Sequence, residues 1–365
     1  MATPPKVGQA PPPFALQSTP QLPELLHQLG ITLMLSTYQA GKVVMLSAVD
    51  DERIVQLPRS FNRPMGITED PATDRLAIAC RDEVIVLRNA PMAAPSYPNG
   101  PGKYDALYLP RMTYHTGPLD IHDLRFGDGG KSLYAVNTRF SCIMQLGDQY
   151  SFTPVWQPKW IDALMPEDRC HLNGMAMREG RPAYATAFST TNTPQGWRDT
   201  VTTSGVIVDV ASGETISSGV AMPHSPRWYD GKLYVLQTAK GLVSTVDLDS
   251  GKLTTVCHVG GFVRGMARAG DYLFVATSKL RKNSSTFAQL DFAKSADRAS
   301  VVVIYLPSGA KVGEMAYAAS VDEIYDVHVL VGKRRVNVLN TITNTHQRAL
   351  TSPAMSFWGS EEGEG

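Results

Sequence analysis

From Ile31 to about Leu350, apolar residues come in short runs rich in Val, Ile, Leu, Tyr and Thr, interrupted by Gly, Asp and Ser. Such runs between turn residues are typical of strands and hairpins. Residues 75–88 show the recurring unit, in which LAIAC and VIVL flank the turn RDE. The same strand–turn–strand pattern returns at 32–46, 132–146 and 232–248. The pattern predicts an all-β chain of repeated hairpins.

A second element precedes most of these hairpins, a short segment of small or polar residues followed by a turn. Its copies span 62–70, 119–129, 171–180, 224–231, 262–270 and 323–332. This spacing is typical of the four-stranded blades of a β-propeller. The innermost strand of a blade crowds the central channel, where glycines such as Gly66, Gly174 and Gly265 fit. Six inner strands predict a single closed propeller of six blades.

The two ends of the chain are expected to close the ring. Three strands, at about 31–37, 42–48 and 52–58, precede the first inner segment, and two or three more follow the last. Shared between the chain ends, they complete one blade and leave no free edge. A seventh blade is the alternative, if the N-terminal strands form a blade of their own.

Outside the propeller, the sequence predicts two flexible ends and one short helix. The first residues are rich in proline and hold little that could pack. Thr19 is expected to cap a helix from about Leu22 to Leu29, with Pro20 in its first turn. The predicted boundaries are 1–18 for a flexible leader, 19–352 for the propeller and 353–365 for a flexible tail.

Composition narrows the partners and the compartment. Lys and Arg together number 34, as do Asp and Glu, and no basic block marks a nucleic-acid-binding protein. No apolar run is long enough to span a membrane, and the N-terminus has no secretory signal pattern. The four cysteines form no CxxC pair and are expected to be buried thiols. We therefore expect a cytoplasmic protein without disulfides, and no pattern specifies an oligomer.

Longer motifs carry a resemblance to a known family. They are STYQAGK (36–42), FNRPMGI (61–67), YHTGPLDIHDL (114–124), VNTRFSC (136–142), EDRCHLNGMAMREGRP (167–182), GWRD (196–199) and MPHSPRWYDGKLYVL (222–236). Over about 30–350 the chain closely resembles an uncharacterised family of bacterial proteins with a domain of unknown function. The resemblance implies a propeller broadly similar to the six-bladed gluconolactonase-like and strictosidine-synthase-like proteins, and implies no activity. The resemblance also implies a small residue at the position of His328, so we expect no family-wide role for His328.

Side chains of an inner strand alternate between the channel and the blade interior. Aligning the six segments gives a polar set that faces the axis: Arg63, Met65, Asp120, His122, His171, Asn173, Arg264, Glu323 and Tyr325. His224 has the opposite parity unless its strand is bulged or shifted by one residue, which Pro223 and Pro226 favour. The sequence therefore predicts a polar site at the channel.

Three interpretations of this site remain open. In the first, His122, His171 and His224 bind one divalent transition metal (Fe, Zn, Cu or Ni), because neutral imidazole suits these ions. Asp120 or Glu323 then completes or orients the metal's ligands. The isolated placement of the histidines along the chain makes this a hypothesis that needs structural context.

In the second interpretation the site holds no metal, and a histidine acts as general acid or base. The catalytic candidates are His122, His171 and Tyr325. Arginine would hold a carboxylate or phosphate with two hydrogen bonds. The ligand-binding candidates are Arg63, Asp120, Asn173, Arg264 and, from a long polar loop that could cover the channel mouth, Trp197 and Arg198.

In the third interpretation the polar residues satisfy one another, and the function lies on outer loops that bind another protein. No P-loop or Rossmann glycine pattern is present, so no nucleotide cofactor is expected. The sequence favours a propeller that binds a small polar or anionic molecule, as an enzyme of the hydrolase, lyase or oxygenase kind. A non-catalytic binding protein or interaction scaffold is the alternative.

Overall fold

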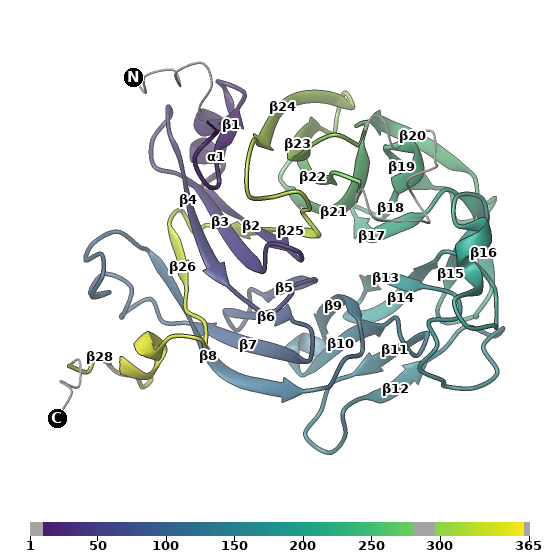
Figure 1. The fold of residues 1–365 in the computed structure, drawn as a ribbon, viewed down its shortest axis with the longest axis horizontal. Helices are drawn as coiled ribbons and strands as arrows, with labels where there is room; N and C mark the ends of the chain where they lie inside the picture. Colours follow the sequence, from purple (N-terminus) through teal and green to yellow (C-terminus); the bar gives the residue numbers. More distant parts are fainter. Residues whose placement is uncertain (1–9, 281–295, 361–365) are drawn as a thin grey trace.

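The computed structural model describes residues 10–280 and 296–360, which form a six-bladed β-propeller (Figure 1). Each blade is an antiparallel sheet whose innermost strand lies beside the central channel. All six inner segments predicted from the sequence form these innermost strands. We number the blades in the chain order of the inner strands.

The strands of each blade are given from the channel outward. Blade 1 contains β5 (Ile67–Asp70), β6 (Arg75–Ala79), β7 (Glu83–Asn89) and β8 (Ala106–His115), and blade 2 contains β9 (Ile121–Gly127), β10 (Ser132–Asn137), β11 (Cys142–Gln145) and β12 (Thr153–Trp156). Blade 3 contains β13 (Leu172–Arg178), β14 (Arg181–Ala187), β15 (Gly205–Asp209) and β16 (Thr215–Val220), and blade 4 contains β17 (Pro223–Tyr229), β18 (Lys232–Gln237), β19 (Leu242–Val246) and β20 (Leu253–His258). Blade 5 contains β21 (Phe262–Ala269), β22 (Tyr272–Ser278), β23 (Ala299–Tyr305) and β24 (Ala310–Tyr317).

Blade 6 is built from both ends of the chain and closes the ring. Its inner strand β25 (Asp326–Val331) is C-terminal, and the outer strands β2 (Ile31–Thr37), β3 (Lys42–Ala48) and β4 (Ile54–Ser60) are N-terminal. β25 pairs antiparallel with β2, from Ile31 opposite Val331 to Ser36 opposite Asp326. The N-terminal strands therefore do not form a blade of their own, so the predicted closure is confirmed and the seven-bladed alternative is wrong.

The helix α1 has the predicted bounds, Leu22–Leu29, but Thr19 does not cap it. Its N-cap is Gln21, and the proline in its first turn is Pro23 instead of Pro20. The Thr19 hydroxyl is engaged elsewhere, because it accepts a hydrogen bond from the Glu314 amide at 2.9 Å and lies 3.2 Å from the Glu314 carbonyl. The helix buries Leu22 and Leu26 in the apolar core between blades 5 and 6.

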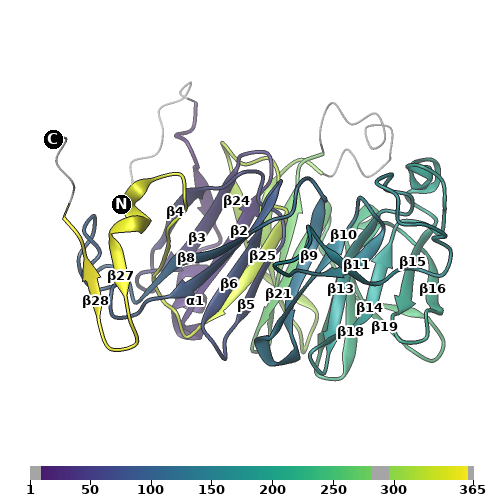
Figure 2. The same ribbon diagram turned by 90° about the horizontal axis from the view of Figure 1, so that it is seen from below.

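Both ends of the described chain add strands to the ring. β1 (Leu16–Ser18) pairs with β24, and β26 (Val336–Val338) pairs in parallel with β8. A C-terminal hairpin of β27 (Ala349–Thr351) and β28 (Ser356–Trp358) lies beyond the outer edge of blade 1 (Figure 2). Paired residues thus extend into both segments expected to be flexible, while the proposed domain boundaries stay predictions. In the described residues, no helix is long and apolar enough to cross a membrane.

Close contacts between inner strands explain the glycines near the axis. A side chain at Gly66 of blade 1 would meet Leu124 of blade 2 at 2.7 Å, and one at Gly265 of blade 5 would meet the backbone of Val327 in blade 6 at 2.5 Å. At Gly174 of blade 3, the neighbour is Pro226 of blade 4, at 2.4 Å. Alternate blades therefore carry a glycine on which the next blade packs.

Hydroxyl groups join neighbouring blades near the channel. In each case a hydroxyl at or just after a blade's second strand donates to a carbonyl at or just before the next inner strand. The pairs are Ser36 with Met65, Thr138 with Leu172 (2.6 Å), Thr238 with Val263 (2.7 Å) and Ser278 with Ile324 (3.0 Å). We call these four contacts the blade joints.

The joint at Ser36 is expected to contribute to closure of the ring. Its hydroxyl donates to the Met65 carbonyl and accepts the Asp326 amide at 3.1 Å. Ser36→Ala leaves both buried groups without this partner, so we expect the free energy of unfolding to fall by about 1–3 kcal/mol. Urea unfolding measures the change. Ser218→Ala, at an exposed position of β16, is the matched control, and an equal effect of both substitutions would contradict the role of the joint.

Candidate functional site

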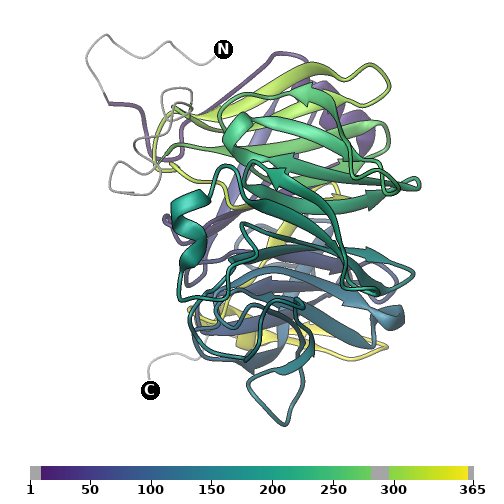
Figure 3. The ribbon, with the colours of Figure 1, turned by 90° about the vertical axis from the view of Figure 1, so that its right-hand side faces the viewer.

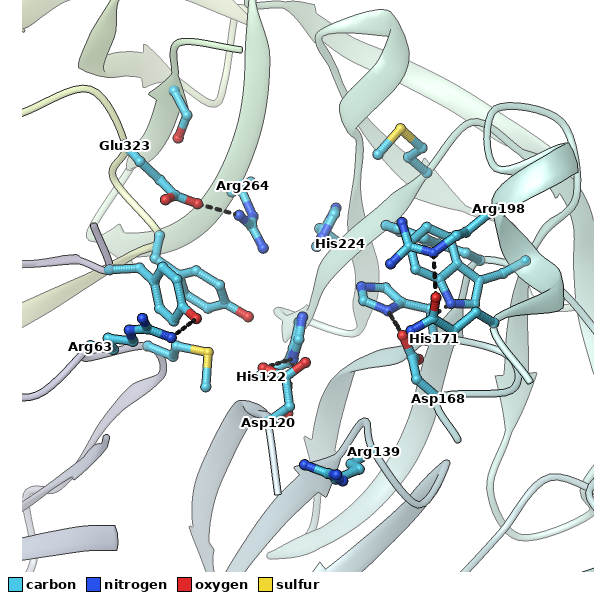
Figure 4. Close-up of a pocket in the computed structure, with 18 of the residues that line it drawn as sticks. Arg63, Asp120, His122, Arg139, Asp168, His171, Arg198, His224, Arg264 and Glu323 are labelled. Atoms are coloured by element: carbon cyan, nitrogen blue, oxygen red, sulfur yellow. Dashed lines mark hydrogen bonds and ion pairs between the residues drawn. The ribbon is translucent and has the colours of Figure 1, made fainter. Parts of the chain in front are cut away.

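A cavity of about 990 Å³ occupies one mouth of the central channel. Its walls come from residues around the start of the inner strands and from loops that follow the second strands of several blades (Figure 4). One of these loops carries the short 3-10 helix η2 (Gly196–Thr200), which projects from one face of the ring (Figure 3). Most of the residues predicted to face the axis line this cavity.

Buried ion pairs occupy the channel below the cavity. Arg227 of blade 4 donates to Asp123 of blade 2 at 2.8 Å and lies 4.0 Å from Asp326 of blade 6. Each carboxylate also accepts a backbone amide from the next blade, Met175 for Asp123 (3.2 Å) and Ile67 for Asp326 (3.1 Å). These residues form a floor, so the cavity is a closed-bottomed pocket at this point of the channel.

His122 reaches the cavity from β9 with its ring held in one orientation. Its Nδ1 lies 2.9 Å from the Asp120 carbonyl and 2.8 Å from the Thr138 hydroxyl. The single Thr138 proton is donated to the Leu172 carbonyl, so the hydroxyl accepts from the imidazole. Nδ1 must therefore carry the proton, which leaves Nε2 with its lone pair. Burial lowers the pKa of His122 and favours the neutral ring.

His224 repeats this arrangement two blades further along. Its Nδ1 lies 2.7 Å from the Thr238 hydroxyl, which donates to the Val263 carbonyl. Burial also holds the pKa of His224 well below its usual value. The pairing of β17 with β18 shifts register between His224 and Arg227, which is the irregularity that the prolines favour. His224 thereby lines the cavity, and within the described residues its buried Nε2 has no hydrogen-bond partner.

His171 lies between these two histidines and is held by a carboxylate. Its Nδ1 is 3.0 Å from Oδ2 of Asp168, and the same oxygen accepts the Trp197 indole N–H at 3.0 Å. The indole and Phe188 pack against the imidazole, with ring centres 4.4 and 4.5 Å away. The centres of His122 and His171 are 4.9 Å apart. In all three histidines, Nδ1 is therefore held by a protein partner, and Nε2 points away from that partner.

Arg264 and Tyr325 form the opposite wall, on blades 5 and 6. Arg264 donates to Glu323 at 2.7 Å, and its guanidinium lies 4.2 Å from the centre of the Tyr325 ring. The centre of the same ring lies 5.7 Å from the centre of the His122 ring. Burial raises the pKa of Tyr325 well above its usual value, so its hydroxyl keeps its proton and is suited to donate a hydrogen bond.

The remaining predicted residues divide between the cavity and its surroundings. Arg63, Asp120 and Arg198 line it with exposed or partly exposed side chains, and Trp197 lines it while almost fully buried. Asn173 lies one level lower, beside a cavity of about 10 Å³ that His122 and His224 also line. His328 lies away from the site, near Glu69. The four cysteines are buried, as expected.

Sequence reasoning missed the two threonines that hold His122 and His224. Thr138 and Thr238 fix two rings, and Asp168 fixes the third. A signal was present, because each threonine directly follows the second strand of a blade that carries a histidine on its inner strand. The ion-paired floor and Arg139, another cavity-lining cation, were also missed.

The fold and site together define a six-bladed propeller with a polar cavity over a closed channel. The sequence family described as Domain of unknown function (DUF4915) matches residues 20–339, and the chain belongs to this family. No curated protein matches the chain. The likeness to gluconolactonase-like and strictosidine-synthase-like proteins stays an expectation.

Two solved structures share the fold. One, from the crystal structure of a Nidogen/Laminin complex, is 8% identical, with a TM-score of 0.53 over 83% of this chain and 99% of that chain. The other, a protein of unknown function from Bacteroides caccae, is 11% identical, with a TM-score of 0.51 over 82% of this chain and 98% of that chain. At these identities the likeness extends to the fold alone.

The floor of the cavity makes a stability prediction. Arg227→Leu removes the cation that lies between buried Asp123 and Asp326, whereas Arg125 stays 3.2 Å from Asp123, so we expect a loss of about 3 kcal/mol in the free energy of unfolding. Urea unfolding at neutral pH measures the loss. Arg88→Leu, at an exposed position of β7, is the control and should change stability by less than about 0.5 kcal/mol. Equal stability of the two variants would show that the floor does not need Arg227.

Proposed function

We propose that this protein binds a small anionic molecule in the central cavity and acts on it as an enzyme. The observation that carries the proposal is the charge of the cavity wall. Cationic side chains from several blades face one closed-bottomed pocket, and most of the carboxylates beside them already have partners. A substrate with carboxylate or phosphate groups would complete this arrangement, because guanidinium groups bind such anions with two hydrogen bonds.

The lining carboxylates support this account of the charge. Glu323 pairs with Arg264, Asp168 with His171 and Trp197, and Glu167 with Arg169 at 2.7 Å. Asp120 remains, half-exposed, near His122. The lining cations are Arg63, Arg81, Arg139, Arg198, Arg264 and Lys279. Arg81 pairs with Asp82 at 3.5 Å and Lys279 with Asp322 at 2.5 Å, so the charge that attracts an anion comes mainly from Arg63 and Arg139.

Two rim arginines are particularly suited to a ligand. Arg63 packs its guanidinium 5.6 Å from the centre of the Tyr38 ring, and Arg139 donates to the Pro118 carbonyl at 3.1 Å. Among the described residues, neither has a carboxylate partner within salt-bridge distance. Both side chains are exposed, and Figure 4 places them on two sides of the pocket around His122.

Left-handed backbone conformations occur at the cavity wall, and also at several turns elsewhere in the described residues. Arg63, Asp120 and His171 have φ values of 48, 56 and 51°, in the left-handed region that non-glycine residues rarely occupy. Such a conformation costs about 1–3 kcal/mol, and strained residues cluster at functional sites. Here all three line the same cavity, beside neutral imidazoles that can accept a proton or bind a metal.

The scaffold alternative rests on a different surface. Leu350, Met355 and Phe357 are exposed on or next to the hairpin of β27 and β28, at the outer edge of the ring. Exposed apolar residues that lie together favour contact with another protein. The cavity lies at the channel instead, so binding at the hairpin and chemistry in the cavity are separable.

Anion binding in the metal-free protein tests the proposal. Titration calorimetry at low ionic strength, with inorganic phosphate and citrate as probes, should detect binding of at least one anion. Arg63→Gln and Arg139→Gln should each weaken it about tenfold, the effect of losing about 1.4 kcal/mol of charge-assisted contact. Arg88→Gln, outside the cavity, should leave it unchanged. Failure of both anions to bind, or equal binding by all variants, would contradict the proposal.

A further inference from the structure

The three cavity histidines share a feature that an acid–base role does not require. Each engages Nδ1 with a different partner on the protein: Thr138 for His122, Asp168 for His171 and Thr238 for His224. In the described residues, no hydrogen bond is found for the Nε2 of any of them. Histidines that bind metals typically donate their second ring N–H to a carboxylate, carbonyl or other acceptor in this way.

We propose that His122, His171 and His224 bind one divalent transition metal through Nε2. This inference rests on the proposed function, because it assigns the reacting centre of the same cavity. Three imidazole ligands suit Zn²⁺, Fe²⁺, Cu²⁺ or Ni²⁺. With three protein ligands, the metal keeps an open position for a water or an oxygen atom of the anion.

The spacing of the His122 and His171 rings favours binding of one ion by both. Nitrogens about 2.0–2.1 Å from one zinc ion place the centres of their imidazole rings about 5 Å apart. The centres of His122 and His171 are 4.9 Å apart, with ring planes at 86°. The spacing of these two rings therefore matches that of two imidazoles bound to one ion.

His224 has to move to complete the site. Among the residues that the structure describes, no three His, Cys, Asp or Glu side chains are close enough to hold one ion as they stand. The ring of His224 packs against Phe188, with centres 5.1 Å apart. No described residue holds its buried Nε2, so a shift of that atom toward the other two histidines breaks no hydrogen bond at Nε2, and the shift has to be small enough to keep the Nδ1 contact with Thr238.

The charges around the three rings allow a cation. Arg264 is a wall cation whose charge acts on His122 and His224, and it is paired with Glu323 at 2.7 Å. Asp120 adds a negative charge 3.8 Å from Nδ1 of His122. The arginines of the rim would then hold the anionic end of a ligand whose other oxygen binds the metal.

Titration of the full-length, chelator-treated chain with Co²⁺ tests the site. Expression should avoid a polyhistidine tag. We expect one Co²⁺ per chain, with the visible absorption of a low-symmetry nitrogen-ligated ion, and displacement by Zn²⁺. His122→Ala, His171→Ala and His224→Ala should each abolish this signal, whereas His328→Ala, outside the cavity, should leave it intact.

The threonines provide a test of how the ligands are held. Thr138→Val and Thr238→Val should each lower Co²⁺ affinity roughly 10–100-fold, the usual effect of losing a group that orients a metal ligand. Thr138→Ser and Thr238→Ser keep the hydroxyl and should restore affinity. Thr277→Val controls for the loss of a buried hydroxyl, because Thr277 bonds Ser300 and, among the described residues, no hydrogen bond joins it to a histidine.

Two results would overturn the metal site. One is the absence of stoichiometric Co²⁺ or Zn²⁺ binding by the wild-type chain, a result that depends on no variant. The other is binding that persists when His122 and His224 are both replaced by alanine. Phosphate or citrate binding by the metal-free protein separates the two proposals, because it can succeed where metal binding fails.

Discussion

The hydrogen bond from a hydroxyl on one blade to a carbonyl at the next inner strand is the interaction on which both ring and site depend. At Ser36 and Ser278 this hydrogen bond joins two blades and involves no histidine. At Thr138 and Thr238 the same hydroxyl also accepts the Nδ1 proton of a histidine. Since a hydroxyl has one proton to donate, each joint fixes the tautomer of its histidine. The packing of neighbouring blades therefore determines which imidazole nitrogen carries the proton and which one keeps its lone pair.

Buried, oppositely charged side chains cross the channel below these histidines. Asp123 and Asp326 each accept an amide from a neighbouring blade, and Arg227 lies between them. This buried network closes the channel and leaves the polar residues above it facing a pocket of about 990 Å³. The channel thus contains mutually paired polar residues, as expected of a scaffold, and a polar pocket above them, as expected of a binding site.

The sequence predicts the ring better than the site, for physical reasons. Repeated inner segments, glycines such as Gly66 and the shared closing blade follow from periodicity and from the need to avoid a free edge. Strand parity also places His122 and Arg264 at the channel. Other contacts of the site join different blades: the Thr138 hydroxyl bonds the Leu172 carbonyl, 34 residues away, and Arg227 bonds Asp123, 104 residues away. Such contacts depend on how blades are rotated against one another, which one strand's pattern does not specify. Thr19 shows the same limit, because pairing of β1 with β24 takes its hydroxyl to Glu314.

The most direct test of this account is the tautomer of the cavity histidines, read by long-range ¹H–¹⁵N correlation of labelled side chains in the metal-free protein at neutral pH. His122 and His224, assigned through His→Gln variants, should be neutral with the proton on Nδ1 and a bare Nε2. Protonation at Nε2 in either ring would contradict the account, since its Nδ1 would no longer donate to the blade joint and Nε2 would have no lone pair to offer to the cavity.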